Sequence, residues 1–242
     1  MGAHIIVFDL DGTLADTSAD LLAAANQAVA EAGWPPMLSH PKDALCAFRG
    51  GRAMLKLSHA RLAAQGGSDL PQEEAFIEAG YPRLLAAYGA AIDRHTRLYE
   101  GAVQAVQALR AAGHATAICT NKPEALAVDL VAKLGVSDLF DALVGADTLP
   151  TRKPDVAPYH ETLRRAAKRR FGVDLGADVR DFPQSCLIGD TVTDRETARA
   201  AGVPSILVGF GPEGGDIARL SPEAILDHYS DLPALIERVL SA

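Results

Sequence analysis

The chain has few basic residues and no long apolar run. It contains 23 Lys and Arg against 31 Asp and Glu, which gives a formal net charge of −8. Proteins that bind nucleic acids usually carry a basic excess or a basic stripe, so this balance argues against a general nucleic-acid partner. No apolar run approaches the roughly 18 residues that a membrane span requires, so we expect no membrane partner either. An anionic substrate stays compatible with the composition, because net charge is a global property and a binding site is local.

Cysteine and histidine are also scarce. The three cysteines are Cys46, Cys119 and Cys186, and two of them lie in apolar, strand-like runs. We interpret them as buried reduced thiols, which suits a cytosolic protein. The seven histidines show no spacing typical of metal ligands and are expected to be non-catalytic. No basic segment precedes the first apolar run, so we expect no targeting signal and a cytoplasmic location.

Short apolar runs alternate with helical patterns along much of the chain. The runs are IIVF (5–8), HATAIC (114–119), ALVGA (142–146), SCLIG (185–189) and SILVG (205–209). The segments between them include PEALAVDLVAKLG, where Pro123 suits a first helical turn, and DRETARAAG, which Gly202 closes. This alternation predicts an α/β fold with a Rossmann-like parallel sheet that is covered on both faces. Such sheets bind ligands at the carboxyl ends of their strands.

One long segment, residues 17–95, interrupts this alternation. It contains Ala- and Leu-rich helical patterns and no convincing strand, with Thr17 or Ser18 as the expected cap of its first helix and Gly33 as its stop. We therefore predict a helical cap domain at 17–95 and a core domain made of residues 1–16 and 96–242. The less regular segment 166–183 is expected to be the end of a helix followed by a surface loop.

The stretch IIVFDLDGTLAD raises the main chemical question. Its four apolar residues predict a buried strand, and two carboxylates, Asp9 and Asp11, follow that strand at once. Burying a charge without a partner is costly, and two like charges repel each other. Taken alone, the pair could be a turn with aspartates that cap the next helix.

Other polar residues follow the later strands. Thr120 and Asn121 come after the second strand, in CTNKP, and Lys153 lies in a loop after the third, in RKPD. Asp190 and Asp194 follow the fourth strand in IGDTVTD, and a glycine-rich loop, GFGPEGG, follows the fifth. These residues should meet at one edge of the sheet. Thr120 and Asn121 could instead simply cap a helix, Asp194 could cap a helix that begins near Arg195, and a lone lysine is usually a surface residue.

A divalent cation would explain the clustered carboxylates. Mg²⁺ prefers oxygen ligands and would offset the repulsion between them. A phosphate beside the cation would be held by Thr120, Asn121, Lys153 and backbone N–H groups at a helix N-terminus. The pattern therefore predicts chemistry on a phosphorylated small molecule.

The two aspartates of the first motif can then take different roles. One carboxylate can attack phosphorus and form an aspartyl-phosphate. The other can protonate the leaving oxygen and afterwards activate water. Gly12 would let the chain turn sharply, and Thr13 could bond to Asp11 or to the loop backbone.

The complete set of motifs resembles the haloacid dehalogenase-like superfamily of phosphohydrolases. DLDGT matches the D-x-D-x-T motif of that family, Thr120 its second motif, Lys153 its third, and GDTVTD its acidic fourth motif. The resemblance implies that Asp9 is the nucleophile and Asp11 the acid/base. It also implies that Mg²⁺ is bound by Asp9, by the backbone carbonyl of Asp11 and by Asp190.

The same resemblance implies a supporting role for Asp194, which would bond to metal-bound waters or to Lys153. FDLDGTLADT, TNKPEALA and a C1-type helical cap are most similar to the bacterial phosphoglycolate phosphatases. This implies a Mg²⁺-dependent phosphatase acting on a small metabolite such as 2-phosphoglycolate, as a monomer or homodimer. Two departures from that group are LYEGA, which has no proline before the glycine, and a longer distance from Lys153 to Asp190.

Residues in the predicted cap bear on the substrate and on the alternatives. FRGGR places Arg49 and Arg52 where either could meet a substrate carboxylate, although both could be solvated loop residues. Lys56 could be the Schiff-base lysine of a phosphonoacetaldehyde hydrolase, but Asp11 and Lys153 argue against that group. A sugar-phosphate phosphatase or mutase, a pyrophosphatase and a non-enzymatic phosphate-binding protein remain as further alternatives.

Overall fold

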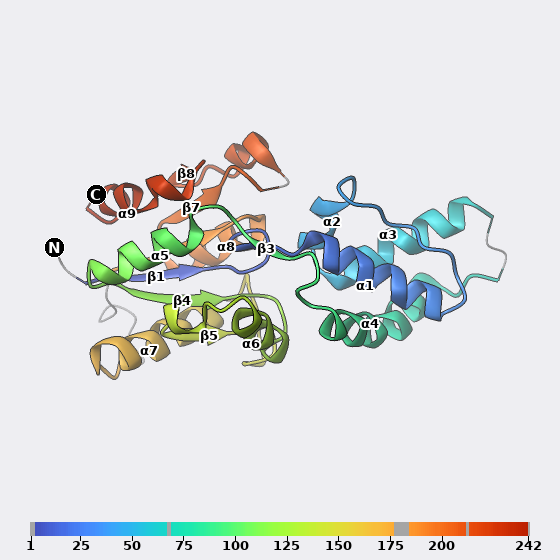
Figure 1. The fold of residues 1–242 in the computed structure, drawn as a ribbon, viewed down its shortest axis with the longest axis horizontal. Helices are drawn as coiled ribbons and strands as arrows, with labels where there is room; N and C mark the ends of the chain where they lie inside the picture. Colours follow the sequence, from blue (N-terminus) through green and yellow to red (C-terminus); the bar gives the residue numbers. More distant parts are fainter. Residues whose placement is uncertain (1–2, 67–68, 177–183, 212, 242) are drawn as a thin grey trace. The chain divides into compact units, whose positions relative to one another are not determined.

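The computed structural model describes residues 3–66, 69–176, 184–211 and 213–241. The chain divides into two compact units. One, the sheet unit, consists of Met1–Ala15 and Leu98–Ala242, and the other, the helical unit, is Asp16–Arg97 (Figure 1). Two short strands, β2 (Ala15–Asp16) and β3 (Arg97–Leu98), pair where the chain passes between the units.

The sheet unit contains a six-stranded sheet in the order β5-β4-β1-β6-β7-β8, and all its neighbouring strands are parallel. The predicted α/β fold is therefore confirmed. The strands are β1 (Ile5–Phe8), β4 (Ala115–Cys119), β5 (Ala142–Val144), β6 (Ser185–Gly189), β7 (Ser205–Val208) and β8 (Ala224–Leu226). The helices are α5 (Ala102–Ala111), α6 (Glu124–Lys133), α7 (Ala157–Phe171), α8 (Val192–Ala201) and α9 (Leu232–Leu240), with short 3₁₀ turns at η1 (Ser137–Leu139), η3 (Gly214–Leu220) and η4 (Tyr229–Asp231).

The central strand β1 is buried on both faces, as its uninterrupted apolar run predicts. Successive side chains of a strand point to opposite faces. Ile5 and Val7 accordingly share one core cluster with Tyr159 and Leu163 of α7 and with Ala198 of α8. On the strand, Ile6 and Phe8 alternate with them and are equally buried.

Five of the six strands match the predicted apolar runs, and the sixth was not predicted. β8 contains only Ala224, Ile225 and Leu226, which is too short to show a periodicity. This strand joins the sheet by pairing with β7, and no local sequence pattern indicates that contact. Helix α6 begins at Glu124, with Pro123 just outside it rather than in its first turn.

The helical unit consists of α1 (Ser18–Glu31), α2 (Ala44–Phe48), α3 (Gly51–Ala64) and α4 (Glu73–Ala90). Helix α1 packs against each of the other three. Thr17, one of the two predicted residues, is the N-cap of this helix, although its side chain makes no capping hydrogen bond. The Asp16 carboxylate accepts hydrogen bonds from the backbone N–H and the hydroxyl of Ser18. Gly33 ends the helix with a positive φ of 87°, as predicted.

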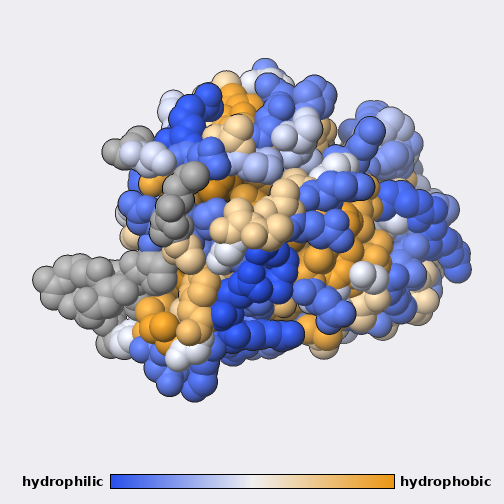
Figure 2. All heavy atoms as spheres, turned by 60° about the vertical axis from the view of Figure 1, so that its left-hand side comes forward, coloured by the Kyte–Doolittle hydropathy of each residue, from blue (hydrophilic) through white to orange (hydrophobic). Residues whose placement is uncertain are grey.

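No helix within the described ranges is both long enough and apolar enough to cross a membrane. Hydrophilic residues (blue) dominate much of the face that Figure 2 shows, with separate areas of apolar residues (orange) between them. The exposed large apolar side chains of the described residues are Val128, Val173 and Val192. They belong to different segments, and scattered apolar residues of this kind are ordinary on a protein surface.

The segment 166–183 was predicted to be the end of a helix followed by a loop. Helix α7 ends at Phe171, and Gly172 follows it with a positive φ of 68°. Residues 177–183 of that segment lie outside the described part of the chain.

Candidate active site

The predicted functional residues of the sheet unit meet because of the order of its strands. β1 pairs with β4 on one side and with β6 on the other, in a register that aligns Phe8 with Ile118 and with Ile188. The residues that follow these three strands therefore lie next to one another at the carboxyl edge of the sheet. They include Asp9 after β1, Thr120 after β4 and Asp190 after β6.

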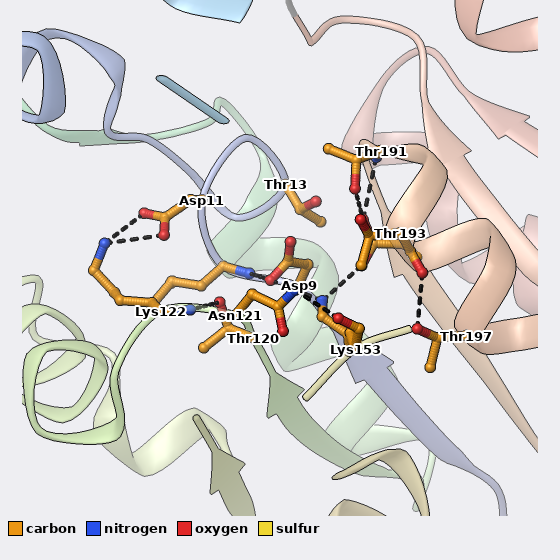
Figure 3. A network of polar contacts seen from close by, with 12 residues as sticks. Asp9, Asp11, Thr13, Thr120, Asn121, Lys122, Lys153, Thr191, Thr193 and Thr197 are labelled. Carbon is orange, nitrogen blue, oxygen red and sulfur yellow. Dashed lines mark hydrogen bonds and ion pairs between the residues drawn. The ribbon is translucent and has the colours of Figure 1, made fainter. Parts of the chain in front are cut away.

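Lys153 is buried between two carboxylates. Its Nζ lies 3.2 Å from Asp9 Oδ1 (Figure 3). The same Nζ lies 2.6 Å from Asp194 Oδ1. The other contact of Asp9 Oδ1 is the backbone N–H of Leu10, at 2.7 Å. One ammonium group thus bridges two carboxylates that are far apart in the sequence, and it fixes the orientation of the Asp9 side chain.

Thr13 bonds to a partner that the sequence did not indicate. Its hydroxyl donates to Asp190 Oδ1 at 3.3 Å. The turn at Gly12 makes this contact possible, because its φ of 79° is a conformation that favours glycine. A Cβ atom at Gly12 would lie only 2.1 Å from Asp190 Oδ2, so the close approach of the two loops also requires glycine.

Asp194 acts in two ways at once. The helix α8 begins at Val192, a turn earlier than predicted, and Asp194 is its third residue rather than its cap. Its Oδ2 accepts hydrogen bonds from the N–H and the hydroxyl of Thr191, which closes a capping box, while Oδ1 binds Lys153. The helix start thereby holds the carboxylate that in turn holds Lys153.

Asp11 has a buried partner that the sequence reasoning missed. Lys122 Nζ lies 2.8 Å and 2.9 Å from the two carboxylate oxygens of Asp11 (Figure 3). Lys122 belongs to CTNKP, directly after the polar pair at the end of β4. The place of Lys122 at a strand end, next to two candidate phosphate ligands, could have indicated that it belongs to the site. Lys153 was predicted from its similar place after a strand end.

The loop after β4 is held by its own polar groups. Thr120 Oγ1 accepts a hydrogen bond from the N–H of Lys122 at 3.2 Å, and the Asn121 side-chain amide donates to the Lys153 carbonyl at 3.0 Å. The N–H of Glu124, in the first turn of α6, donates to Asp147 Oδ1 at 2.7 Å. One N–H of the predicted anion site is thus already bonded to a carboxylate of this chain.

Burial changes the ionisation of the site. It raises the pKa of Asp9 to about 6, although the ammonium of Lys153 works in the opposite direction. Burial and the neighbouring Asp194 and Asp9 carboxylates also raise the pKa of Asp190 well above its usual range. Burial alone would lower the pKa of Lys153, but Asp194 and Asp9 raise it above its ordinary value, so that this lysine is charged. These directions describe a site in which negative charge is in excess.

The donor set fits a hard divalent cation. Asp9, Asp190 and Asp194 are buried and each offers a carboxylate oxygen within 4.8 Å of the others. When Asp9, Asp11, Asp190 and Asp194 are all ionised, the ammonium groups of Lys122 and Lys153 leave two negative charges uncompensated. An all-oxygen donor set with an excess of two charges suits Mg²⁺. The side chain of Asp11 is not in the cluster, which leaves only its backbone carbonyl as a donor.

Tyr229 is a further residue that no sequence signal indicated. It lies in η4, and its hydroxyl donates to the backbone carbonyl of Thr13 at 2.7 Å. The tyrosine is buried and also contacts the ring of Phe210, at 5.4 Å between ring centres. A residue near the end of the chain thus supports the loop that carries Asp9 and Asp11, and only the tertiary fold brings the two together.

The candidates in the helical unit are in a different setting. Arg52 is exposed, pairs with Glu78 at 2.5 Å and lies over the ring of Tyr81. Arg49 is exposed; its backbone N–H donates to the Cys46 carbonyl at 3.1 Å, whereas its guanidinium has no hydrogen-bond or ion-pair partner among the described residues. Lys56, the candidate Schiff-base lysine, is exposed and pairs with a glutamate, which is unlike the buried amine that such chemistry needs.

The chain is similar in sequence and fold to several known proteins. Residues 6–208 match the family model of haloacid dehalogenase-like hydrolases. A phosphoglycolate phosphatase of Agrobacterium fabrum is 37% identical over 98% of this chain and 94% of its own length. One from Mesorhizobium japonicum is 35% identical over 100% and 99%. The crystal structure of a predicted phosphoglycolate phosphatase from Haemophilus somnus has the same fold, with a TM-score of 0.77, 24% identity and coverage of 96% and 97%.

Proposed function

The chain belongs to the haloacid dehalogenase-like hydrolase family and is a phosphatase, and from this premise we propose that it hydrolyses 2-phosphoglycolate with Mg²⁺ as its metal ion. The observation that carries the proposal is the convergence of Asp9, Asp11, Asp190 and Lys153 at one sheet edge. The relatives from Agrobacterium fabrum and Mesorhizobium japonicum are both named for this activity.

Asp9 is the proposed nucleophile. Lys153 and the N–H of Leu10 hold its carboxylate in place. With a pKa of about 6, this carboxyl group is mostly ionised at neutral pH and can attack. One carboxylate oxygen forms a bond to phosphorus, the ester P–O bond breaks, and an aspartyl-phosphate results.

Asp11 is the proposed general acid and base. It donates a proton to the leaving oxygen as the ester bond breaks, and it then accepts a proton from the water that hydrolyses the aspartyl-phosphate. The same group returns to its starting state after one turnover.

The phosphoryl oxygens are proposed to bind to Thr120, Asn121 and Lys153. Asp9, Asp190 and the backbone carbonyl of Asp11 would hold Mg²⁺, and Asp194 would stay on Lys153 and support the site from outside. When bound, Mg²⁺ neutralises the charge of the phosphate and of the carboxylates. The helical unit would act as the cap that excludes water and supplies specificity, in a cytoplasmic enzyme that is a monomer or homodimer.

Within the helical unit, Arg49 and Arg52 are the proposed contacts to the carboxylate of the substrate. Arg52 already pairs with Glu78, whereas Arg49 has no such partner in the described residues, so Arg49 is the stronger of the two.

Removal of the metal ion tests the proposal most directly. Phosphate release from a panel of phosphoesters, with 2-phosphoglycolate among them, should stop in EDTA and return with Mg²⁺. Ca²⁺ should support it poorly, because its looser coordination misplaces the nucleophile. Full activity in EDTA would contradict the metal assignment, and a preference for another phosphoester would contradict the substrate.

Thermal unfolding gives a readout that is independent of turnover. A ligand that binds only the folded state stabilises it, by about 2.7 kcal/mol at a concentration of 100 Kd. Mg²⁺ should therefore raise the Tm of the wild-type protein and raise that of Asp190→Asn much less. An equal shift in both proteins would show that Asp190 is not a ligand.

A further inference from the structure

The ammonium group of Lys122 lies beside the proposed acid/base, at the place where the leaving group of the substrate must be. Its side chain is only 2% exposed, and its Nζ is 2.8 Å and 2.9 Å from the two oxygens of Asp11. A general acid works within about 2.6–3.2 Å of the oxygen that it protonates. The leaving oxygen, Asp11 and Lys122 are therefore immediate neighbours during the reaction.

The position of Lys122 is fixed by its backbone as well as by its side chain. Its N–H donates to Thr120 Oγ1 at 3.2 Å, and its carbonyl accepts a hydrogen bond from the N–H of Ala146 at 2.9 Å. The loops after β4 and β5 thus hold it from both sides. A rigid charged group is suited to selecting between ligands, because little conformational freedom is lost when a ligand binds.

The chemistry of 2-phosphoglycolate brings its carboxylate to the same place. A single methylene separates its ester oxygen from the carboxylate carbon, so the carboxylate must lie close to the group that protonates that oxygen. An ammonium has three N–H donors and can bridge two carboxylates. Lys153 does so in this same site, with Asp9 and Asp194.

We propose that Lys122 recognises the substrate carboxylate next to the leaving oxygen, and that it thereby makes this phosphatase selective for short phosphorylated acids. The inference rests on the substrate class given under the proposed function. In this proposal a buried residue of the sheet unit binds the substrate carboxylate, and Arg49 is an additional contact.

The test compares two substrates of nearly equal size. 2-Hydroxyethyl phosphate replaces the carboxylate of 2-phosphoglycolate with a neutral hydroxymethyl group. The measured quantity is the ratio of kcat/KM for 2-phosphoglycolate to kcat/KM for 2-hydroxyethyl phosphate. Lys122→Met keeps an unbranched side chain one atom shorter and removes its charge. It should slow both substrates, because Asp11 loses a partner, but it should lower the ratio by roughly 10- to 150-fold, as expected for a lost bond between charged groups.

A matched control is Lys133→Met, in the helix that follows Lys122. Lys133 pairs with Asp129 one turn earlier and is 39% exposed, so this variant removes an ammonium group far less buried than that of Lys122. It should keep the wild-type ratio. If the wild-type ratio is high and Lys122→Met has the same ratio, the inference is wrong and the proposed function stands. A wild-type ratio near one overturns the substrate assignment and the inference together.

A second pair of variants covers the case in which Lys122→Met does not fold, as judged by circular dichroism. Lys122→Arg keeps the charge and should retain most of the ratio. Lys122→Gln keeps hydrogen-bond donors without the charge and should lose it. Equal ratios in these two variants overturn the inference.

Discussion

The ion pairs of Lys122 and Lys153 at the carboxyl edge of the sheet are buried, whereas several of those in the helical unit are open to water. The side chains of Lys153 and Asp194 are 1% and 0% exposed, but those of Arg52 and Glu78 are 49% and 59% exposed. Both pairs are short, at 2.6 Å and 2.5 Å, so distance alone does not distinguish them.

The difference in burial decides what each pair can do. Water screens an exposed pair, which contributes little to stability. A buried charge without its partner is costly, so every charge in the sheet-edge site constrains the position of the next one. The same residue types therefore form a constrained buried network at the sheet edge and water-screened pairs on the helical unit.

The strongest test of the buried network is Asp9→Asn. The substitution keeps the size of the side chain and removes the attacking charge, so turnover should fall by at least about 10³-fold, a scale typical of a lost nucleophile. The fold should survive, because one of several clustered negative charges is removed. Steady-state kinetics and circular dichroism measure the two effects, and near-wild-type turnover would disprove the mechanism.

A smaller effect is expected from the exposed arginines. Arg49→Ala should lower kcat/KM for 2-phosphoglycolate by about 10-fold, the lower end of what a charge-assisted contact gives, because Arg49 is exposed. It should spare p-nitrophenyl phosphate, which has no carboxylate. Arg52→Ala is the comparison and should change the selectivity less, since its guanidinium already binds Glu78. Equal losses on both substrates would show that neither arginine reads the carboxylate.

The helical unit also contains one pair with a buried carboxylate, like the pairs at the sheet edge. Arg61 binds both oxygens of Asp43, at 2.6 Å and 2.8 Å, and these hydrogen bonds lower the pKa of Asp43 to about 2. A carboxyl whose folded-state pKa is lowered stabilises the fold above its unfolded-state pKa, near 4, and this contribution is lost as the pH falls through about 2. Asp43→Asn should therefore destabilise the helical unit by about 2 kcal/mol at pH 7.

The chain contains a single tryptophan, Trp34, and it lies in the helical unit. Its fluorescence during urea unfolding reports on that unit and measures the effect of Asp43→Asn. The difference between variant and wild type should shrink as the pH is lowered from about 4 towards about 2. A difference that is independent of pH would mean that Asp43 acts through packing and not through its charge.

The smallest effect is expected at the exposed pair of Arg52 and Glu78. Glu78→Gln removes the partner of Arg52, and Trp34 fluorescence should show no measurable change in the unfolding midpoint, because both side chains are largely in water. A loss as large as that of Asp43→Asn would remove the distinction between exposed and buried pairs on which the comparison rests.

The sequence by itself determined the fold class and most of the site. Alternating apolar runs and helical patterns predict a parallel sheet, and polar residues placed directly after those runs must meet at its carboxyl edge. Asp9, Asp11, Thr120, Lys153 and Asp190 were found in this way. The information was local, because each residue lies a short distance along the chain from the end of its own strand.

Only the tertiary structure decided how these residues pair. Strand order places Lys153 between Asp9 and Asp194, and the fold brings Tyr229 to the backbone of Thr13 from near the other end of the chain. The strand β8 and the bond between Thr13 and Asp190 depend in the same way on neighbours that are distant in sequence. A hydrogen bond or an ion pair depends on distance and burial in space, and neither is encoded in a local pattern of residue types.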